Sequence, residues 1–313
     1  MTEPAGPRAH ASHKTRAIEA ATGAGRALGL EVGEPVVLHD GFSMVVHLAP
    51  SPVVVRVPRV LPAGLALAAQ SARQAREIAV VQWLDEQGFP VVRPSALVPR
   101  TPVTRDGFSM TFWEKVEIDA SAAPDFLANA ARVVDLHAAL RACPVALPFL
   151  SPLAISVPGG LAHLDANPTL IEPSDLAKAN AEWRVLAPVM ASAGAFRTRF
   201  PRARVQPIHG DAPAYNLVTT TTGIRHADFE DATLGTPEWD VAAFGPEVHA
   251  AYDAAAERSG LPPLDADVLR VMQSARSLQM VACLAIAPQY PGLAEAIAPM
   301  IAEWRGKPLI VAA

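Results

Sequence analysis

Short runs of β-branched residues, separated by turn-forming residues, dominate the pattern of hydrophobic positions near the start of the chain. Turns at Asp40-Gly41 and at residues 50–52 divide these runs, which is typical of strands joined by tight connections. We therefore expect an antiparallel meander of three strands over residues 36–38, 44–49 and 53–57. In the third strand the alternating valines share one face, so Arg56 must point to the opposite face.

The pattern changes to a helical period over residues 68–87, where Ile78, Val81 and Leu84 recur at three-residue spacing before Gly88. Glu77 lies within this helix. A proline-rich connector follows over residues 90–102, and residues 108–116 form another predicted strand. The first third of the chain thus predicts a small sheet with one helix.

Beyond residue 116 the pattern is mainly helical, with one short β region over residues 207–229. A small sheet lobe followed by a larger helical lobe belongs to the α+β class. We predict helices over residues 124–142, 173–193, 237–259, 265–286 and 292–304. The predicted division is a flexible tail over residues 1–16, an N-terminal lobe over 17–113 and a C-terminal lobe over 114–313.

Composition narrows the class of protein. Half of the 313 residues are apolar, 18% are charged and the formal net charge is −5, which excludes a broadly basic nucleic-acid scaffold and indicates a folded protein. Cys143 and Cys283 are too few for a disulfide framework, so we expect a cytoplasmic location. No apolar stretch approaches the roughly 18–20 residues that cross a bilayer, and we expect no membrane anchor.

The most informative polar residues lie in the β region of the second lobe. His209, Asp211 and Asn216 follow a short apolar run, and two further strands then meet at a turn near Thr222. Antiparallel pairing about that turn brings Asn216 opposite Asp228 to within about one residue. An amide oxygen and a carboxylate beside Asp211 are ligands of the kind that Mg²⁺ accepts.

These residues carry a resemblance. His209-Gly-Asp211, Asn216 five residues later, Asp228-Phe-Glu230 and Trp239-Asp240 resemble the motifs of the aminoglycoside phosphotransferase family, which are small-molecule kinases related to protein kinases. The resemblance implies a bilobal protein-kinase-like fold. It also implies that Asp211 is catalytic, that His209 supports its loop, that Asn216 and Asp228 bind Mg²⁺, and that Asp240 anchors the loop.

The sequence departs from the family at one position. The family normally uses a lysine to hold the nucleotide phosphates, but no lysine lies between Lys14 and Lys115, so we expect Arg56 to replace it with Glu77 as its partner. Gly41 and Ser43 stand where the family has a glycine-rich loop. By resemblance, the segment between the lobes contacts the adenine through Trp113, Glu114, Lys115 and Val116.

The function that this reading predicts is transfer of the γ-phosphoryl group of ATP or GTP to a hydroxyl group of a small molecule, with Mg²⁺ as cofactor. Carboxylates after the hairpin favour an amine-bearing acceptor such as an amino sugar or an aminoglycoside-like compound, with Glu230 and Asp231 as candidate substrate-binding residues. We expect no nucleic-acid or membrane partner, and a monomer or homodimer.

Simpler interpretations stay open for several of these residues. Arg56 and Glu77 are also explained as surface groups, His209 as structural support, and His137 as a packed helix residue. Two alternative functions also remain. One is a catalytically weak nucleotide-binding regulatory module, which the missing lysine favours. The other is a metal-dependent hydrolase that uses His209, Asp211, His226 and Asp228 as ligands.

Overall fold

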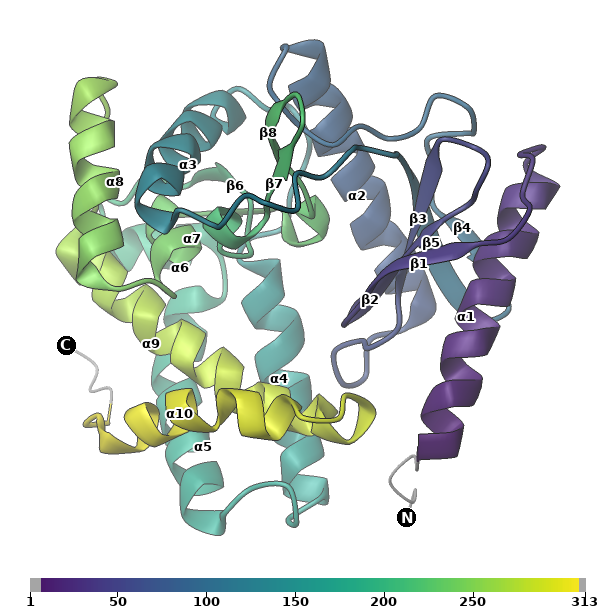
Figure 1. Ribbon diagram of the computed structural model, residues 1–313. Helices are drawn as coiled ribbons and strands as arrows, with labels where there is room; N and C mark the ends of the chain where they lie inside the picture. Colours follow the sequence, from purple (N-terminus) through teal and green to yellow (C-terminus); the bar gives the residue numbers. More distant parts are fainter. Residues whose placement is uncertain (1–6, 310–313) are drawn as a thin grey trace.

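The computed structural model describes residues 7–309 and shows two lobes (Figure 1). The smaller lobe contains a five-stranded sheet with the long helices α1 and α2 beside it. The larger lobe is mostly helical and holds two small two-stranded sheets. The α+β class and the kinase-like division into a sheet lobe and a helical lobe are therefore confirmed.

The sheet of the smaller lobe is antiparallel, with strand order β1-β2-β3-β5-β4. The predicted meander is present, and its register places Val45 opposite Arg56. The three valines that alternate along the third strand are all fully buried, which leaves Arg56 on the other face. The strands are β1 (Val36–Asp40), β2 (Ser43–His47), β3 (Val53–Pro58), β4 (Val103–Arg105) and β5 (Phe108–Glu114).

The structure differs from the tail predicted for residues 1–16, because helix α1 runs from Pro7 to Ala27. Residues 1–6 lie outside the described part of the chain. Helix α1 buries a stripe of small side chains against the sheet, namely Ala17, Ala20, Ala21 and Ala24. Alanine lets the helix approach the sheet closely and has the highest helix propensity, so this stripe stabilises the helix. Because the buried face consists of alanines and not of large apolar residues, the sequence shows only a weak amphipathic pattern there.

Helix α2 (Leu67–Glu86) connects the two lobes. It ends near Gly88, whose φ of +74° is the left-handed conformation that closes helices. Its apolar residues Ile78, Val81 and Leu84 share one core cluster with Leu136 and Phe229 of the larger lobe. The helix is thus held against both lobes, so its polar side chains are fixed relative to the larger lobe.

The larger lobe surrounds its own core, which is centred on α4, α5, α9 and α10. Its helices are α3 (Phe126–Leu140), α4 (Ser151–Ala166), α5 (Pro173–Met190), α6 (Ala193–Arg199), α7 (Pro237–Val241), α8 (Pro246–Arg258), α9 (Ala266–Ala282) and α10 (Leu293–Gly306). Its shorter elements are β6 (Gln206–Ile208), η1 (Pro213–Tyr215), β7 (Leu217–Thr220), β8 (Gly223–His226), η2 (Phe229–Asp231), β9 (Thr233–Gly235) and η3 (Cys283–Gln289).

The helices of this lobe differ from the prediction at several places, and α6 is one that was not predicted. The single helix expected over residues 237–259 is divided into α7 and α8, because Pro246 begins a new helix directly after Gly245. Helix α4 was not predicted, because Pro158, Gly159 and Gly160 within it are poor helix formers. Within residues 7–309, no helix has the length and apolarity needed to cross a membrane.

Candidate active site

The loop after β6 presents an aspartate to solvent on a tightly held backbone. The carboxylate of Asp240, itself fully buried, accepts hydrogen bonds from the backbone N–H groups of His209 at 3.0 Å and Gly210 at 2.8 Å. The indole of Trp239 donates to the Gly210 carbonyl at 2.7 Å. The side chain of the next residue, Asp211, is 49% exposed. Asp240 thus lies where the sequence predicted an anchor for this loop.

The glycine of this loop has no space for a side chain. Gly210 adopts a φ of +90°, and a Cβ atom there would lie 1.9 Å from the backbone oxygen of Asp231. His209 beside it is fully buried, and its Nε2 atom lies 3.0 Å from the Ala227 carbonyl oxygen. His209 therefore connects the loop to the hairpin, which is the supporting position that the sequence predicted.

The hairpin of β7 and β8 carries the predicted amide and carboxylate at its base. Leu217 pairs with His226, and the N–H of Ala227 donates to the Asn216 carbonyl at 2.9 Å, so Asp228 follows one residue after the position opposite Asn216. This agrees with the predicted register. The side-chain amide of Asn216 also donates to the backbone carbonyl of Asp211 at 2.7 Å, which ties the hairpin to the aspartate loop.

Arg56 of β3 lies at the junction of the lobes, among three carboxylates. Its Nη2 atom is 2.7 Å from Oδ1 of Asp228, and its Nη1 atom forms an ion pair with Glu230. The predicted partner, Glu77 of α2, is present at a longer distance of 3.7 Å. Arg56 is therefore not a surface residue, and its two shortest ion pairs join the sheet lobe to η2 and the residue before it.

The charges of this cluster are unevenly balanced. Burial opposes ionisation of Glu230, but Arg56 and Arg73 outweigh it and lower the pKa of this carboxyl. Glu77 is 1% exposed and both of its carboxylate oxygens lack a hydrogen-bond partner, so burial raises its pKa well above the ordinary value. The cluster thus contains one carboxylate that is well stabilised and one that a further cation would stabilise.

Two members of the cluster were missed by the sequence analysis. Gln70 of α2 donates to Glu230 at 2.6 Å, and Arg73 lies 3.2 Å from Glu230 and forms an ion pair with Asp231. The signal for them is the helical spacing of residues 70, 73 and 77, which places three polar side chains on one face of a helix that packs between the lobes. All three are buried.

Arg276 of α9 is a third polar residue that the sequence did not reveal. Its guanidinium lies 4.0 Å over the ring of Trp239, and its Nη1 atom is 3.6 Å from Oδ1 of Asp211. Its Nη2 atom donates to the Gly210 carbonyl at 3.4 Å. Helix α9 follows this loop by more than fifty residues, and no local motif marks its arginine, so only the packing of α9 against α7 brings the two together.

An apolar cavity of about 400 Å³ lies between the sheet and the hairpin. Arg56, Glu77 and Asp228 stand at its polar end, and its walls include Val45, Val54, Val81, Val92, Trp113, Val116, Ile118, Val218 and Phe229. Apolar walls with a few charged groups at one end are typical of a ligand site. This is the place predicted for the adenine ring and the phosphates that follow it.

Two backbone N–H groups of the segment between the lobes are already used in hydrogen bonds within the chain. The N–H of Glu114 donates to the Arg93 carbonyl at 2.9 Å, and the N–H of Lys115 donates to the Pro52 carbonyl at 3.1 Å. The Lys115 side chain forms an ion pair with Glu117 instead of lining the cavity. Of the four predicted contacts, Trp113, Glu114 and Val116 do line it.

The turn between β1 and β2 contacts the larger lobe beside the site. The backbone N–H groups of Arg59 and Val60 both donate to the Phe42 carbonyl, at 2.8 and 3.1 Å. The Phe42 ring stacks on Tyr290 of the larger lobe, with centroids 4.7 Å apart. Ser43 lines a second cavity, of about 380 Å³, which Asp211 also lines, while a Cβ atom at Gly41 would lie 2.6 Å from the His39 ring. The turn is thus folded onto the larger lobe.

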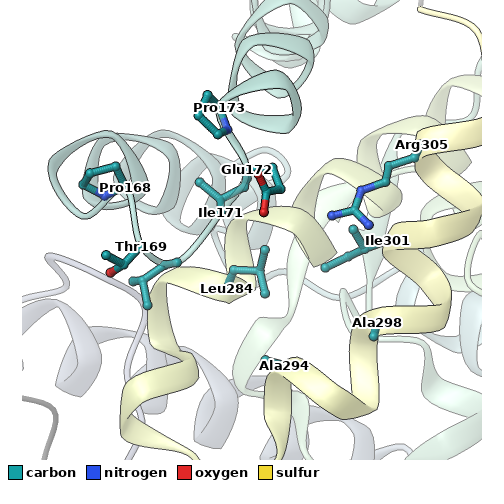
Figure 2. A pocket seen from close by; sticks show the side chains of 11 residues that line it. Pro168, Thr169, Ile171, Glu172, Pro173, Leu284, Ala294, Ala298, Ile301 and Arg305 are labelled. Atoms are coloured by element: carbon teal, nitrogen blue, oxygen red, sulfur yellow. The ribbon is translucent and has the colours of Figure 1, made fainter.

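A further cavity of about 510 Å³ lies elsewhere, between the loop before α5 and helix α10 (Figure 2). Its charged side chains are Glu172 and Arg305, and Arg305 is paired with Asp175 at 2.6 Å. None of the residues that the sequence singled out lines this cavity. The predicted chemistry therefore belongs to the cleft between the lobes.

The donor atoms at the base of the hairpin fit a divalent cation. The amide nitrogen of Asn216 is used in its bond to Asp211, which leaves the amide oxygen as the ligand atom. The Asp228 carboxylate, whose Oδ1 atom is 2.7 Å from Arg56, would supply the second ligand oxygen. Asp228 also has a left-handed backbone, with φ +61° and ψ +55°, a conformation that aspartate tolerates and that is frequent at functional sites.

The metal-hydrolase alternative does not match this geometry. His209 is buried and contacts a backbone carbonyl, while His226 is buried with its Nδ1 atom unpartnered. Among the described residues, no three His, Cys, Asp or Glu side chains are placed to hold a metal ion together. His137 is a packed helix residue, as the sequence favoured, with its ring between Tyr252 and Asp240.

Comparison with known proteins shows the family of the chain. The model of the phosphotransferase enzyme family, APH, matches residues 37–270, which is well over half of the chain. The chain therefore belongs to this family, and it is a small-molecule phosphotransferase. No curated protein sequence matches it significantly.

Solved structures show the same fold at low identity. A choline kinase, LicA from Streptococcus pneumoniae, is 12% identical, with a TM-score of 0.61 over 92% of this chain and 98% of that one. An aminoglycoside phosphotransferase from Streptomyces rimosus, solved with ADP and streptomycin, is 20% identical, with a TM-score of 0.53 over 81% of this chain and 95% of that one. The amicoumacin kinase hAmiN, solved with AMP-PNP and Ca²⁺, is 13% identical, with a TM-score of 0.59 over 94% and 95%.

Proposed function

We propose that this protein transfers the γ-phosphoryl group of ATP or GTP to a hydroxyl group of a small molecule, with Mg²⁺ as cofactor. The observation that carries the proposal is the convergence of Asp211 and Asp228 on one cavity, with Asn216 hydrogen-bonded to the Asp211 backbone. Nucleotide complexes of proteins with this fold, and the Ca²⁺ of the amicoumacin kinase complex, support a nucleotide and a divalent cation as ligands.

Each residue takes a role that its environment supports. The apolar cavity receives the base between the lobes, with Trp113, Glu114 and Val116 along its edge. Arg56 binds the phosphates through its guanidinium fork, which donates to two oxygens at once. Asn216 and Asp228 hold the metal ion, which neutralises phosphate charge when it is bound. Ser43, the first residue of β2, would donate a hydrogen bond to a phosphate, and Gly41 belongs to the turn before it.

The transfer itself needs orientation more than covalent catalysis. Asp211 accepts the proton of the acceptor hydroxyl as the oxygen forms its bond to the γ-phosphorus. The bond from that phosphorus to the β-phosphate oxygen breaks, and the nucleoside diphosphate leaves with both electrons of that bond. His209 and Asp240 take no part in bonding changes, since both are buried and hold the loop backbone.

The acceptor inferred from the sequence was an amine-bearing compound, because four carboxylates follow the hairpin. In the structure Glu230 and Asp231 are already ion-paired with arginines, and Glu238 is buried with 2% exposure. Glu247 is at the exposed start of α8, outside the residues that line the cavity of Asp211. The structural reason for preferring an amino sugar or aminoglycoside is therefore lost, and the proposal is limited to a hydroxylated small molecule. We also propose that the reaction takes place in the cytoplasm. Its reducing conditions keep thiols such as those of Cys143 and Cys283 free, and nucleoside triphosphates are present there.

The experiment is nucleotide consumption by purified protein with a panel of hydroxylated compounds, compared with the Asp211→Asn variant. We expect this variant to lose roughly a thousandfold in rate, within the range for removal of a general base, while its nucleotide affinity by calorimetry stays within about threefold. Asp165→Asn, on the exposed face of α4, is the matched control and keeps full activity.

Two outcomes would contradict the proposal. Equal turnover by Asp211→Asn and wild type would exclude Asp211 as the base. Tight nucleotide binding without any turnover that depends on Asp211 would favour the alternative of a regulatory nucleotide-binding module. Chelation of divalent cations should abolish turnover and be reversed by Mg²⁺, because the phosphates then lose their main source of charge neutralisation.

A further inference from the structure

The residues that line the cavity of Asp211 indicate which kind of acceptor can bind there. It encloses about 380 Å³ between the β1–β2 turn, residues 58–62, helix α2 and the α9–η3 segment. Its acidic side chains are Asp211, Asp228, Glu230 and Asp231, and its basic side chains are Arg56, Arg73 and Arg276. The acceptor hydroxyl must reach Asp211 within this space, so these groups determine which acceptors bind.

The acidic side chains near the base are already neutralised by the chain itself. Asp231 forms an ion pair with Arg73, and Glu230 is contacted by both Arg73 and Arg56. Asp228 is 2.7 Å from Arg56. The side chain of Arg73 is only 10% exposed, so this neutralising charge is fixed between the lobes and is weakly screened by solvent. Among the described residues of the cavity, each carboxylate has an arginine partner, since even Asp211 lies 3.6 Å from Nη1 of Arg276.

The remaining wall of the cavity is apolar. Phe42, Leu61 and Pro62 line it from the smaller lobe, and Met280 and Ile286 line it from the larger lobe. A hydrocarbon or ring surface placed against this wall leaves water, which stabilises the complex by about 25 cal/mol per Å² of buried apolar area. A charged group in the same place would be desolvated without a partner, which is costly.

We propose, building on the phosphotransferase function above, that the acceptor is an uncharged alcohol whose carbon body packs on this apolar wall, and that Arg73 is the residue that selects against amines. An ammonium group can gain an ion pair here only by displacing a guanidinium that already contacts the carboxylates. Arg73 acts on specificity by occupying Glu230 and Asp231, and the uncharged acceptor leaves these ion pairs intact.

The test uses pairs of acceptors that differ in one cationic nitrogen: choline and 3,3-dimethyl-1-butanol, glucosamine and glucose, phenylalaninol and 3-phenyl-1-propanol. Nucleotide consumption is measured for each, with Asp211→Asn subtracted as background. For each pair with measurable turnover, we expect kcat/KM to be at least about tenfold higher for the neutral acceptor than for the cationic one. A single uncompensated charge produces a ratio of about this size. Preference for the cationic members by an active enzyme would overturn this inference and leave the proposed function standing.

The second arm isolates Arg73. The Arg73→Gln variant releases Asp231 and part of Glu230, so the ratio of neutral to cationic kcat/KM should fall by roughly tenfold. Arg270→Gln removes an exposed arginine paired with Asp267 on α9 and should leave the ratio unchanged. A merely structural role for Arg73 lowers both members of a pair equally, so an unchanged ratio in Arg73→Gln would overturn its assignment. Absence of Asp211-dependent turnover with every acceptor would instead count against the proposed function.

Discussion

Replacement of Asp240 is the most direct test of how the active-site loop is held. The carboxylate is fully buried and accepts three hydrogen bonds, from the His209 N–H at 3.0 Å, the Gly210 N–H at 2.8 Å and His137 Nε2 at 2.9 Å. Asp240→Ala leaves three buried donors without an acceptor. Each costs about 1–3 kcal/mol, so we expect the free energy of unfolding to fall by roughly 3–9 kcal/mol.

The Asp240→Asn variant keeps the shape and one oxygen. Oδ2 of Asp240 serves both His209 and His137, while Oδ1 serves Gly210, so the asparagine must turn its NH₂ group toward one of these donors. We expect an intermediate loss of about 1–3 kcal/mol. This variant remains measurable if Asp240→Ala does not fold, because a protein of this kind has about 5–15 kcal/mol of stability to lose.

The assay is urea unfolding followed by tryptophan fluorescence and circular dichroism, with agreement of the two probes as the check on two-state behaviour. Asp253→Ala is the control, because Asp253 accepts one backbone N–H, that of Leu264 at 2.8 Å. Its expected cost is about 1 kcal/mol. An Asp240→Ala protein as stable as the control would refute the claim that this carboxylate holds the loop.

Two further changes test the charge network and the interior of the larger lobe. Arg56→Lys replaces a fork that reaches Asp228 and Glu230 together by one ammonium group, so we expect weaker ADP binding by calorimetry and a lower Tm. Glu182 is 2% exposed, and burial raises its pKa although it accepts a hydrogen bond from Trp304 at 2.7 Å. Its folded form therefore holds a proton over a pH window in which the unfolded form has lost it, so stability falls as pH rises from the ordinary glutamate pKa through the raised one. We expect Glu182→Gln to remove that fall, as measured by urea unfolding across pH 4–8.

The predictions for Arg56→Lys and Glu182→Gln would each be contradicted by a different result. ADP affinity and Tm equal to wild type in Arg56→Lys would mean that the guanidinium geometry is unimportant and that only its charge matters. A pH profile of Glu182→Gln parallel to that of wild type would mean that other groups produce the decline in stability.

The local pattern of the sequence determined most of the smaller lobe. Alternating valines predict a strand with one buried face, and this alone placed Arg56 on the face opposite these valines. The symmetry of the hairpin about Thr222 likewise predicted that Asn216 and Asp228 would meet at its base, because register in a hairpin follows from the position of the turn. These are short-range consequences of geometry.

Helices with weak local signals could not be predicted in this way. Helix α4 contains Pro158 and two glycines. It forms because neighbouring segments pack closely against these glycines, where a side chain would not fit. A Cβ atom at Gly160 would lie 2.8 Å from Ala282 of α9. Helix α1 is stabilised similarly, by alanines that fit closely against the sheet. Packing between distant segments outweighed propensity at both places.

The charged residues of the cleft show most clearly what the sequence predicted and what only the tertiary structure decided. The sequence identified which acidic residues follow the hairpin, but it counted Glu230 and Asp231 as groups free to bind a substrate. Only the folded structure brings Arg73 from α2 onto both of them, across about 160 positions of sequence. Electrostatic interactions act over a few ångströms of space and carry no local sequence signature, so the arginine partners of Glu230 and Asp231 were decided by tertiary structure.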